Sequence, residues 1–100
     1  MTIWFVSRHP GAIAWAHQAG FEVDQMVDHL SPEQVREGDI VIGTLPINLA
    51  CEICNRKARY LHMRLDLARE DRGRELSVED MVRCRARLEE YFLTRADNKT

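Results

Sequence analysis

The sequence has no long apolar run. Its unbroken apolar stretches span only a few residues, as in Ile3–Val6. A membrane-spanning helix needs about 20 consecutive apolar residues, so these runs exclude one. The opening residues also lack the basic segment and the long apolar segment of a secretory signal. We therefore expect a cytoplasmic protein with no membrane partner.

Cysteine, glycine and proline are scarce as well, at three, five and three residues among 100. An odd number of cysteines cannot close a disulfide framework, which fits a reducing compartment. With 45% hydrophobic and 30% charged residues, the composition excludes a disordered chain and a fibrous repeat. The length predicts a single domain over residues 1–100.

The chain also lacks an excess of positive charge. Its net charge is −2, and residues 1–54 contain only two basic side chains, Arg8 and Arg36, against seven acidic ones. Residues 55–100 contain twelve basic and nine acidic side chains. This balance excludes a broad basic face for long nucleic acid, but it leaves room for a small anion in one pocket.

Strand-like and helix-like segments alternate, which predicts an α/β fold. Thr2–Val6 and Ile40–Ile42 are continuous apolar runs of the kind found in buried parallel strands. Each is followed by a short polar turn, a proline and a predicted helix, at Ala12–Ala19 and Ile47–Lys57. The other predicted elements are strands at 25–30 and 60–65, a helical turn from Ser31, and a closing helix from Ser77 to about Thr94.

From this order we expect an open, mostly parallel, four-stranded Rossmann-like sheet in the order 2-1-3-4, with helices on both faces. Residues 60–65 alternate in polarity, which places Tyr60, His62 and Arg64 on one face of the last strand. That strand is predicted either to form the edge of the sheet or to contribute to a subunit contact.

Ligands of open α/β sheets bind at the carboxyl ends of the strands, where the strand order reverses. That point lies here between the first and third predicted strands, so the loops after them should converge. Arg8 is a forked donor suited to phosphate, His9 can titrate near neutral pH, and helix N-termini favour anions. The candidate catalytic residues are Arg8, His9 and Ser7, and the candidate ligand-binding residues are Gly11, Gly43, Thr44, Leu45 and Asn48.

Structural roles stay open for several of these side chains. Ser7 and Thr44 could cap the helices that follow them, Arg8 could be a solvated loop residue, and Asn48 could face solvent. Cys51 and Cys54 form a CxxC motif about one turn inside a predicted helix, where a redox pair is not expected. A zinc site would need two further ligands at regular spacing, so we expect the two cysteines to share a buried helix face and no metal to be bound.

Ile3–Ala12 reads Ile-Trp-Phe-Val-Ser-Arg-His-Pro-Gly-Ala, a long and unusual segment. It resembles the signature of small CRISPR-associated proteins of the Csx class, which belong to type III systems. The likeness covers nearly the whole chain, because it continues at residues 38–39, 41–46, 48–50, 59–61, 73–77 and 88–90.

The resemblance implies a CARF-like α/β domain and a ring nuclease activity. Such proteins are related to the homodimeric domains that bind cyclic oligoadenylate messengers, and this family is similar to enzymes that linearise cyclic tetra-adenylate. The implied chemistry needs no metal or cofactor: the ribose 2′-OH attacks the adjacent phosphorus and leaves a 2′,3′-cyclic phosphate. Carried onto this chain, the resemblance points to Ser7, Arg8 and His9, then to Thr44 and Asn48, with His9 as the candidate general acid or base.

Two other functions remain open at this stage. A protein that binds the same messenger without cleaving it would need the same pocket. A phosphatase of the histidine type also places Arg-His after its first strand, but it needs a second arginine and histidine in a larger scaffold.

Overall fold

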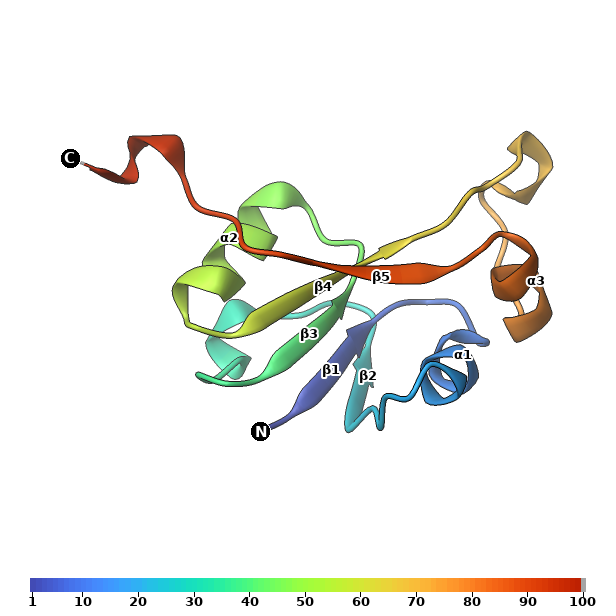
Figure 1. Ribbon diagram of the computed structural model, residues 1–100, viewed down its shortest axis with the longest axis horizontal. Coiled ribbons are helices and arrows are strands. Elements are labelled where there is room, and N and C mark those ends of the chain that lie inside the picture. Colours follow the sequence, from blue (N-terminus) through green and yellow to red (C-terminus); the bar gives the residue numbers. More distant parts are fainter. Residues whose placement is uncertain (100) are drawn as a thin grey trace.

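The computed structural model describes residues 1–99, which form one five-stranded sheet with three α-helices around it (Figure 1). The helices and strands alternate along most of the chain, as expected for an α/β fold. The strands are β1 (Ile3–Val6), β2 (Gln25–Val27), β3 (Ile40–Gly43), β4 (Arg59–Arg64) and β5 (Arg87–Tyr91); the helices are α1 (Ala12–Gln18), α2 (Ile47–Asn55) and α3 (Val78–Arg83); single 3₁₀ turns lie at Pro32–Gln34, Arg69–Asp71 and Ala96–Lys99.

The sheet has the order β2-β1-β3-β4-β5. The first four strands are parallel and keep the predicted order 2-1-3-4, with Trp4 opposite Val41 and Val41 opposite Tyr60. The prediction of four strands was wrong, because β5 pairs antiparallel with β4. β4 therefore lies inside the sheet and is not the edge strand that its alternating sequence had suggested.

The segment Arg87–Tyr91 was predicted as the end of a long closing helix, but it is a strand. α3 ends at Arg83, and Arg85 has φ 58°, in the left-handed region. The N–H of Ala86 then donates to the carbonyl of Met81 at 2.9 Å, which closes the helix end. The residues of this segment favour a helix, but they form β5 because the free backbone groups of β4 offer them a full set of hydrogen bonds.

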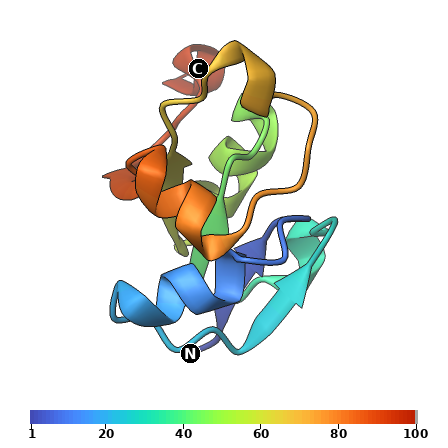
Figure 2. The ribbon, with the colours of Figure 1, turned by 90° about the vertical axis from the view of Figure 1, so that its right-hand side faces the viewer.

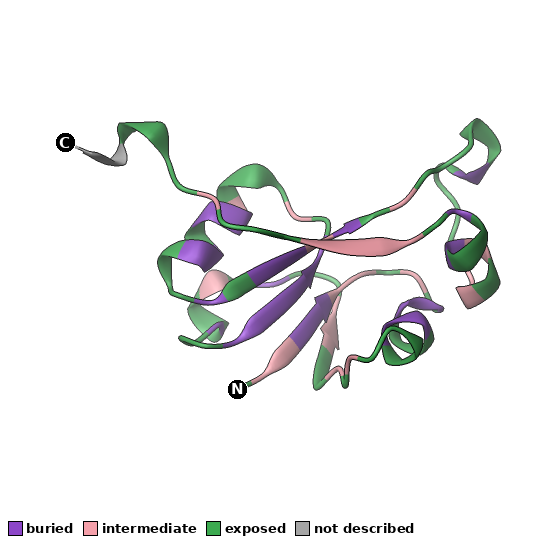
Figure 3. Ribbon diagram, in the orientation of Figure 1, coloured by how far each residue is buried: buried purple, intermediate pink, exposed green. Residues whose placement is uncertain are grey.

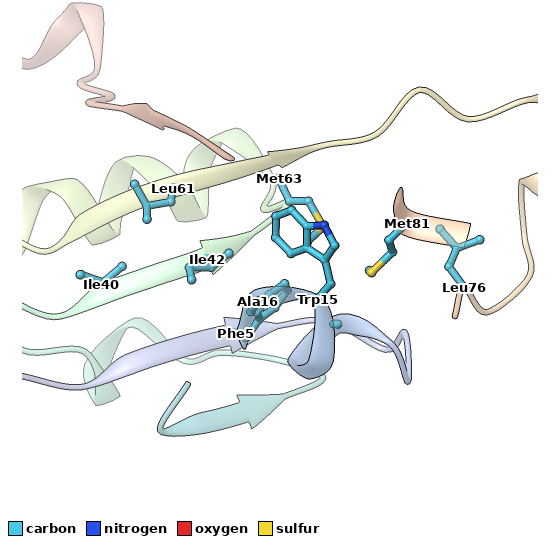
Figure 4. Packing of buried hydrophobic residues seen from close by; sticks show 10 residues of the cluster. Phe5, Trp15, Ala16, Ile40, Ile42, Leu61, Met63, Leu76 and Met81 are labelled. Atoms are coloured by element: carbon cyan, nitrogen blue, oxygen red, sulfur yellow. The ribbon is translucent and has the colours of Figure 1, made fainter. Parts of the chain in front are cut away.

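Helices cover both faces of the sheet, as predicted. Phe5 and Ile42 pack with Trp15 of α1 and Met81 of α3 on one face, and Figure 4 shows Trp15 lying beside Met63 of β4. On the other face Trp4, Val41, Tyr60 and the buried side of α2 form two smaller clusters. Figure 3 shows that many of the buried residues lie in β1, β3 and β4, while residues 92–97 after β5 are mostly exposed.

The buried carboxylate of Asp39 joins β1 to the start of β3. Its oxygens accept hydrogen bonds from the N–H groups of Thr2 at 2.9 Å and Arg36 at 3.0 Å, and from Trp4 Nε1 at 3.2 Å. Burial by itself raises the pKa of Asp39, but these hydrogen bonds outweigh it and hold the pKa below the ordinary value. The Gly-Asp pair before β3 is therefore part of the structural frame.

The cysteines behave as predicted for a buried helix face. Cys51 and Cys54 lie on the covered side of α2, and Cys84, which follows α3, is buried as well. In the described part of the chain, no helix is both long and apolar enough to cross a membrane.

Candidate functional site

A small hollow of about 240 Å³ lies at the carboxyl ends of β1, β3 and β4. It is the place predicted for a ligand, because the order of the parallel strands reverses between β1 and β3. Apolar side chains form its floor and the two loops form its rim. The lining residues are Phe5, Val6, Ser7, Arg8, His9, Gly43, Thr44, Met63 and Leu65.

Among the residues that the structure describes, Arg8 is the only charged side chain that lines this hollow. It is exposed, and no ion pair among the described residues includes it. Seven other arginines of the described chain are paired with carboxylates, so their charge is already balanced. The Arg8 guanidinium is thus available to a phosphate, for which its fork of N–H donors is well shaped.

The loop that carries Arg8 is held on both sides. The Ser7 hydroxyl accepts a hydrogen bond from the N–H of His9 at 3.0 Å, which closes a tight turn around Arg8. His9 in turn accepts a hydrogen bond at Nδ1 from the N–H of Leu76 at 3.1 Å. A backbone N–H can only donate, so in the neutral ring the proton of His9 lies on Nε2.

Gly11 fixes the same loop against α3. Its N–H donates to the carbonyl of Leu76 at 3.2 Å, and a Cβ at this position would lie 2.3 Å from the backbone nitrogen of Val78. Figure 2 shows the two helix starts side by side, with α1 in blue below α3 in orange. Only glycine allows this approach of one backbone to another, so Gly11 has a structural role and does not line the hollow.

An ionic cluster flanks Leu76, the residue that holds His9. Asp71 is buried and accepts hydrogen bonds from Arg83 at 3.0 Å and Arg74 at 2.7 Å. The two guanidinium groups, Arg83 above all, lower the pKa of Asp71 to about 2. Asp80 accepts from the same two arginines and also from the N–H of Ser77, and its pKa is lowered too. The cluster thus fixes both ends of the segment that anchors the first loop.

The second loop is tied to β4. The Thr44 hydroxyl donates to the carbonyl of Met63 at 3.1 Å, and the N–H of Leu45 donates to the Tyr60 hydroxyl at 3.0 Å. Burial is the main reason that the pKa of Tyr60 is raised, so this hydroxyl stays protonated at neutral pH. Thr44 therefore extends the strand pairing rather than capping α2, whose start has no side-chain cap.

The structure brings five of the eight predicted site residues together: Ser7, Arg8, His9, Gly43 and Thr44. Leu45 lines an adjoining hollow on the α2 side of the sheet. Asn48 is exposed and lines a separate hollow between α2 and the chain after β5. Asn48 and Arg8 therefore line different hollows.

Two backbone donors at the start of α1 are used within the fold. The N–H of Gly11 is bonded to Leu76, and the N–H of Ala12 is bonded to the carbonyl of His9 at 3.0 Å. Both groups are therefore occupied and cannot also bind an anion. Neither α1 nor α2 has a side-chain cap, so the alternative that Ser7 and Thr44 are caps is wrong as well.

Sequence reasoning missed the contribution of Leu76 and of the apolar floor. Met63 and Leu65 stand on the face of β4 opposite Tyr60 and His62, an alternation that was visible in the sequence. The Leu76 N–H carried no signal, because a backbone donor 67 residues from His9 has no side-chain signature.

Comparison with known families now adds an independent line of evidence. Residues 4–94 match the sequence model of the family described as "Putative CRISPR-associated protein (Cas_VVA1548)". The chain belongs to this family. The match runs from within β1 to the segment after β5, so the matched part of this chain includes both loops of the hollow and the β4–β5 pair. Neither the curated proteins nor the solved structures contain a match to this chain.

The lining of the hollow narrows the chemistry that this site must be tested for. Its lining contains one arginine and one histidine, whereas a phosphatase of the histidine type needs a second of each. In the described residues no group of three or more histidine, cysteine, aspartate or glutamate side chains is arranged to hold a metal ion. The hollow instead combines the cation of Arg8, the imidazole N–H of His9 and the hydroxyl of Ser7.

Proposed function

We propose that this chain is a ring nuclease that linearises cyclic tetra-adenylate in type III CRISPR antiviral signalling. The observation that carries the proposal is the hollow at the ends of β1 and β3, where the unpaired Arg8 lies beside the tethered His9. Support also comes from membership in a CRISPR-associated family and from the resemblance of Ile3–Ala12 to CARF-related Csx-class proteins. The substrate class rests on that resemblance, and the placement of the anion rests on Arg8.

The reaction requires positioning and charge stabilisation. The 2′-oxygen of one ribose attacks the adjacent phosphorus, the bond from phosphorus to the 5′-oxygen breaks, and a 2′,3′-cyclic phosphate and a 5′-hydroxyl result. The proton of the 2′-OH passes to water, and water returns one to the leaving 5′-oxygen. Arg8 would hold the phosphoryl oxygens, on which negative charge grows, and so lower the barrier.

The hydrogen bond from Leu76 assigns His9 a donor role in this scheme. Nε2–H of the neutral ring points its proton away from the Leu76 contact and can donate to a phosphoryl oxygen. A second proton on Nδ1 would place two N–H donors opposite each other and break the Leu76 bond. The tether therefore favours stabilisation of the phosphoryl oxygens over the acid–base role first considered for His9.

The lining of the hollow also favours a second candidate, a protein that binds cyclic oligoadenylate without cleaving it. Apart from His9, the described residues that line the hollow include no histidine, carboxylate, lysine or tyrosine that could move a proton. A sink or sensor would use the same Arg8 contact and leave the ring intact.

One experiment separates the two candidates. The purified chain is incubated with cyclic tetra-adenylate in the presence of EDTA, and the products are separated by chromatography and mass spectrometry. A ring nuclease yields linear di- or tetra-adenylates with 2′,3′-cyclic phosphate ends, in excess over the protein. Recovery of intact ring at stoichiometric binding supports the sink or sensor. A folded chain that neither binds nor cleaves the ring contradicts both.

We also propose that the functional unit is a homodimer, as the resemblance implies. The hollow beside Arg8 has a volume of about 240 Å³, which fits one phosphate and its ribose rather than a whole cyclic tetranucleotide. A two-fold ligand would then bridge two equivalent sites. Sedimentation of the chain with and without cyclic tetra-adenylate tests this, and a monomer in both conditions would contradict it.

A further inference from the structure

A second hollow, of about 320 Å³, lies on the α2 side of the sheet, next to the end of β4. It has no role in the scheme above. Its walls are largely apolar and aromatic, and two of its side chains come from β5 and the segment after it. The lining residues are Leu45, Ile47, Ala50, Tyr60, His62, Arg64, Tyr91 and Leu93.

This aromatic hollow has no lining residue in common with the hollow beside Arg8, but a third depression adjoins both. The third depression, of about 250 Å³, lies between them along β4. It shares Thr44 and Met63 with the Arg8 hollow, and it shares His62 and Arg64 with the aromatic hollow. A ligand held by Arg8 could therefore extend past Thr44 into the aromatic hollow without leaving the surface.

The aromatic rings form a corner. Tyr91 is 45% exposed, its ring centroid lies 5.7 Å from that of His62, and the two planes meet at 76°. A flat group that stacks on one of these rings presents its edge to the other. Stacking on tyrosine or histidine is the usual way in which proteins hold an unpaired nucleobase.

The polar groups of the corner suit an uncharged ligand. His62 Nδ1 lies 2.7 Å from the Tyr60 hydroxyl, and no hydrogen bond of the described residues uses His62 Nε2. Glu89 accepts hydrogen bonds from Tyr91 at 2.6 Å and from Arg64 at 3.3 Å, so the nearby charges balance. The Arg8 hollow offers an uncompensated cation, whereas this corner offers flat apolar surface and one ring nitrogen.

We infer that the hollow between Tyr91 and His62 binds a nucleobase of the ligand, stacked against an aromatic ring with its polar edge toward His62 Nε2. The inference deepens the proposed function and rests on it for the identity of the whole ligand. The base binds here while the phosphate of the same ligand binds at Arg8, so the two hollows together recognise a nucleotide. Tyr91 and His62 then select for a base, and Arg8 does not.

The test compares two probes that differ only in the base. Adenosine 5′-monophosphate and ribose 5-phosphate are titrated separately into the wild-type chain, and backbone amide shifts report affinity and position. We expect adenosine 5′-monophosphate to bind about 10-fold more tightly, because stacking of one base contributes on that scale. The shifts should include Tyr91 and His62 as well as Arg8. Equal affinities, or shifts confined to the Arg8 loop, would overturn the inference.

Variants of Tyr91 test whether its aromatic ring causes the tighter binding of adenosine 5′-monophosphate. Tyr91→Ala should remove most of the 10-fold preference, whereas Tyr91→Phe should keep it because the ring remains. Phe92→Ala is the matched control, since Phe92 is the next residue, is 77% exposed and lines the separate hollow of Asn48. A preference that survives in Tyr91→Ala would contradict the assignment.

The outcomes stay distinct from those of the ring nuclease assay. If cyclic tetra-adenylate is cleaved, Tyr91→Ala should raise KM about 10-fold and change kcat little, because the base contact is made before and during the reaction. Cleavage with an unchanged KM would overturn the base site and leave the proposed function standing. Absence of cleavage, with the nucleotide preference intact, would overturn the function and leave the base site standing.

Discussion

The two loops that form the hollow follow the same sequence pattern, yet the fold holds them in different ways. Each runs from a buried parallel strand through a polar turn and a proline into a helix. The loop after β1 is anchored to a distant segment, because His9 and Gly11 bond to Leu76. The loop after β3 is anchored to the neighbouring strand, because Thr44 bonds to Met63 and Leu45 bonds to Tyr60.

Because the two loops are anchored differently, they have different roles: the first carries groups that are available to a ligand, and the second mainly stabilises the fold. The first loop places Arg8 and His9 in the lining of the hollow, and no hydrogen bond among the described residues uses the Arg8 guanidinium or His9 Nε2. The second loop turns its hydroxyl and its N–H toward β4, so its polar groups are largely used within the fold. We therefore expect substitutions in the first loop to change activity, and most substitutions in the second to change stability alone.

The largest effect is expected for Arg8→Ala. Loss of the one cation in the hollow should lower kcat/KM for cyclic tetra-adenylate about 100- to 1,000-fold and weaken binding of the ring, because the phosphoryl charge is no longer matched. Arg56→Ala removes the same charge from an exposed position after α2 and should leave the kinetics unchanged. Steady-state rates measured on both variants, with equal unfolding midpoints, make the comparison. Similar rates for Arg8→Ala and wild type would contradict it.

Substitutions of His9 should have the next largest effect on cleavage, and they distinguish the roles of its two ring nitrogens. His9→Asn retains an acceptor for the N–H of Leu76 but has no donor at the position of Nε2, so we expect cleavage to fall about 100-fold with a smaller loss of binding. His9→Gln places an amide N–H near the position of Nε2 and should lose about 10-fold. Single-turnover rates measure both. A ranking in the opposite order would indicate that the Leu76 tether matters more than the donor.

One glycine-to-alanine substitution in each loop compares how much the two loops contribute to the free energy of unfolding. Alanine at Gly11 would bring its Cβ within 2.5 Å of backbone atoms of Ser77 and Val78, whereas alanine at Gly43 would approach the Val6 carbonyl oxygen at 2.9 Å. Overpacking against rigid backbone costs more than a slight overlap, so we expect Gly11→Ala to lower the free energy of unfolding by about 3 kcal/mol and Gly43→Ala by about 1 kcal/mol. Urea unfolding of the two variants measures this. Equal losses would contradict the closer anchoring of the first loop.

Acid should loosen the first loop before the second. The folded pKa of Asp71 is about 2, below its ordinary value of 3.8, so its stabilising contribution is full above pH 4 and is lost as the pH falls toward 2. The anchors of the second loop are neutral hydrogen bonds and do not titrate there. Hydrogen exchange of the Gly11 amide, which donates to the Leu76 carbonyl, should therefore accelerate relative to that of Leu45 between pH 4 and pH 2, after correction for intrinsic rates. An Asp71→Asn variant should exchange faster at Gly11 than the wild-type chain already at pH 5.

Much of the fold could be predicted from local pattern. The apolar runs that became β1 and β3, the helices α1 and α2 and the order 2-1-3-4 all follow from short segments and from the geometry of parallel strands. The error lay at Arg87–Tyr91, where helix-forming side chains pair with β4. Local propensity is a weak preference there, and strand pairing with β4 overrides it.

The residues of the candidate site also fall into two groups, those that the local sequence predicts and those that depend on the fold. Arg8 and His9 stand directly after a buried strand, so their place at the rim was predictable from residues 3–9 alone. Whether Asn48 faces the pocket was left open, because the direction of a side chain in the first turn of a helix depends on how that helix leaves the sheet; the structure places it in a separate hollow. The corner between His62 and Tyr91 was not foreseen, because it exists only when β5 lies beside β4.

The sequence by itself determined the strands that carry the site, the arginine and histidine at its rim, and the membership of the chain in a CRISPR-associated family. Only the tertiary structure decided which nitrogen of His9 carries the proton, which glycine touches another backbone, and which aromatic rings meet beside Thr44. The physical reason is the separation of the residues along the chain. Local patterns specify strands and helices, whereas these contacts join residues 29 to 67 positions apart. Such hydrogen bonds and packing contacts cannot be recognised in the sequence of either segment alone.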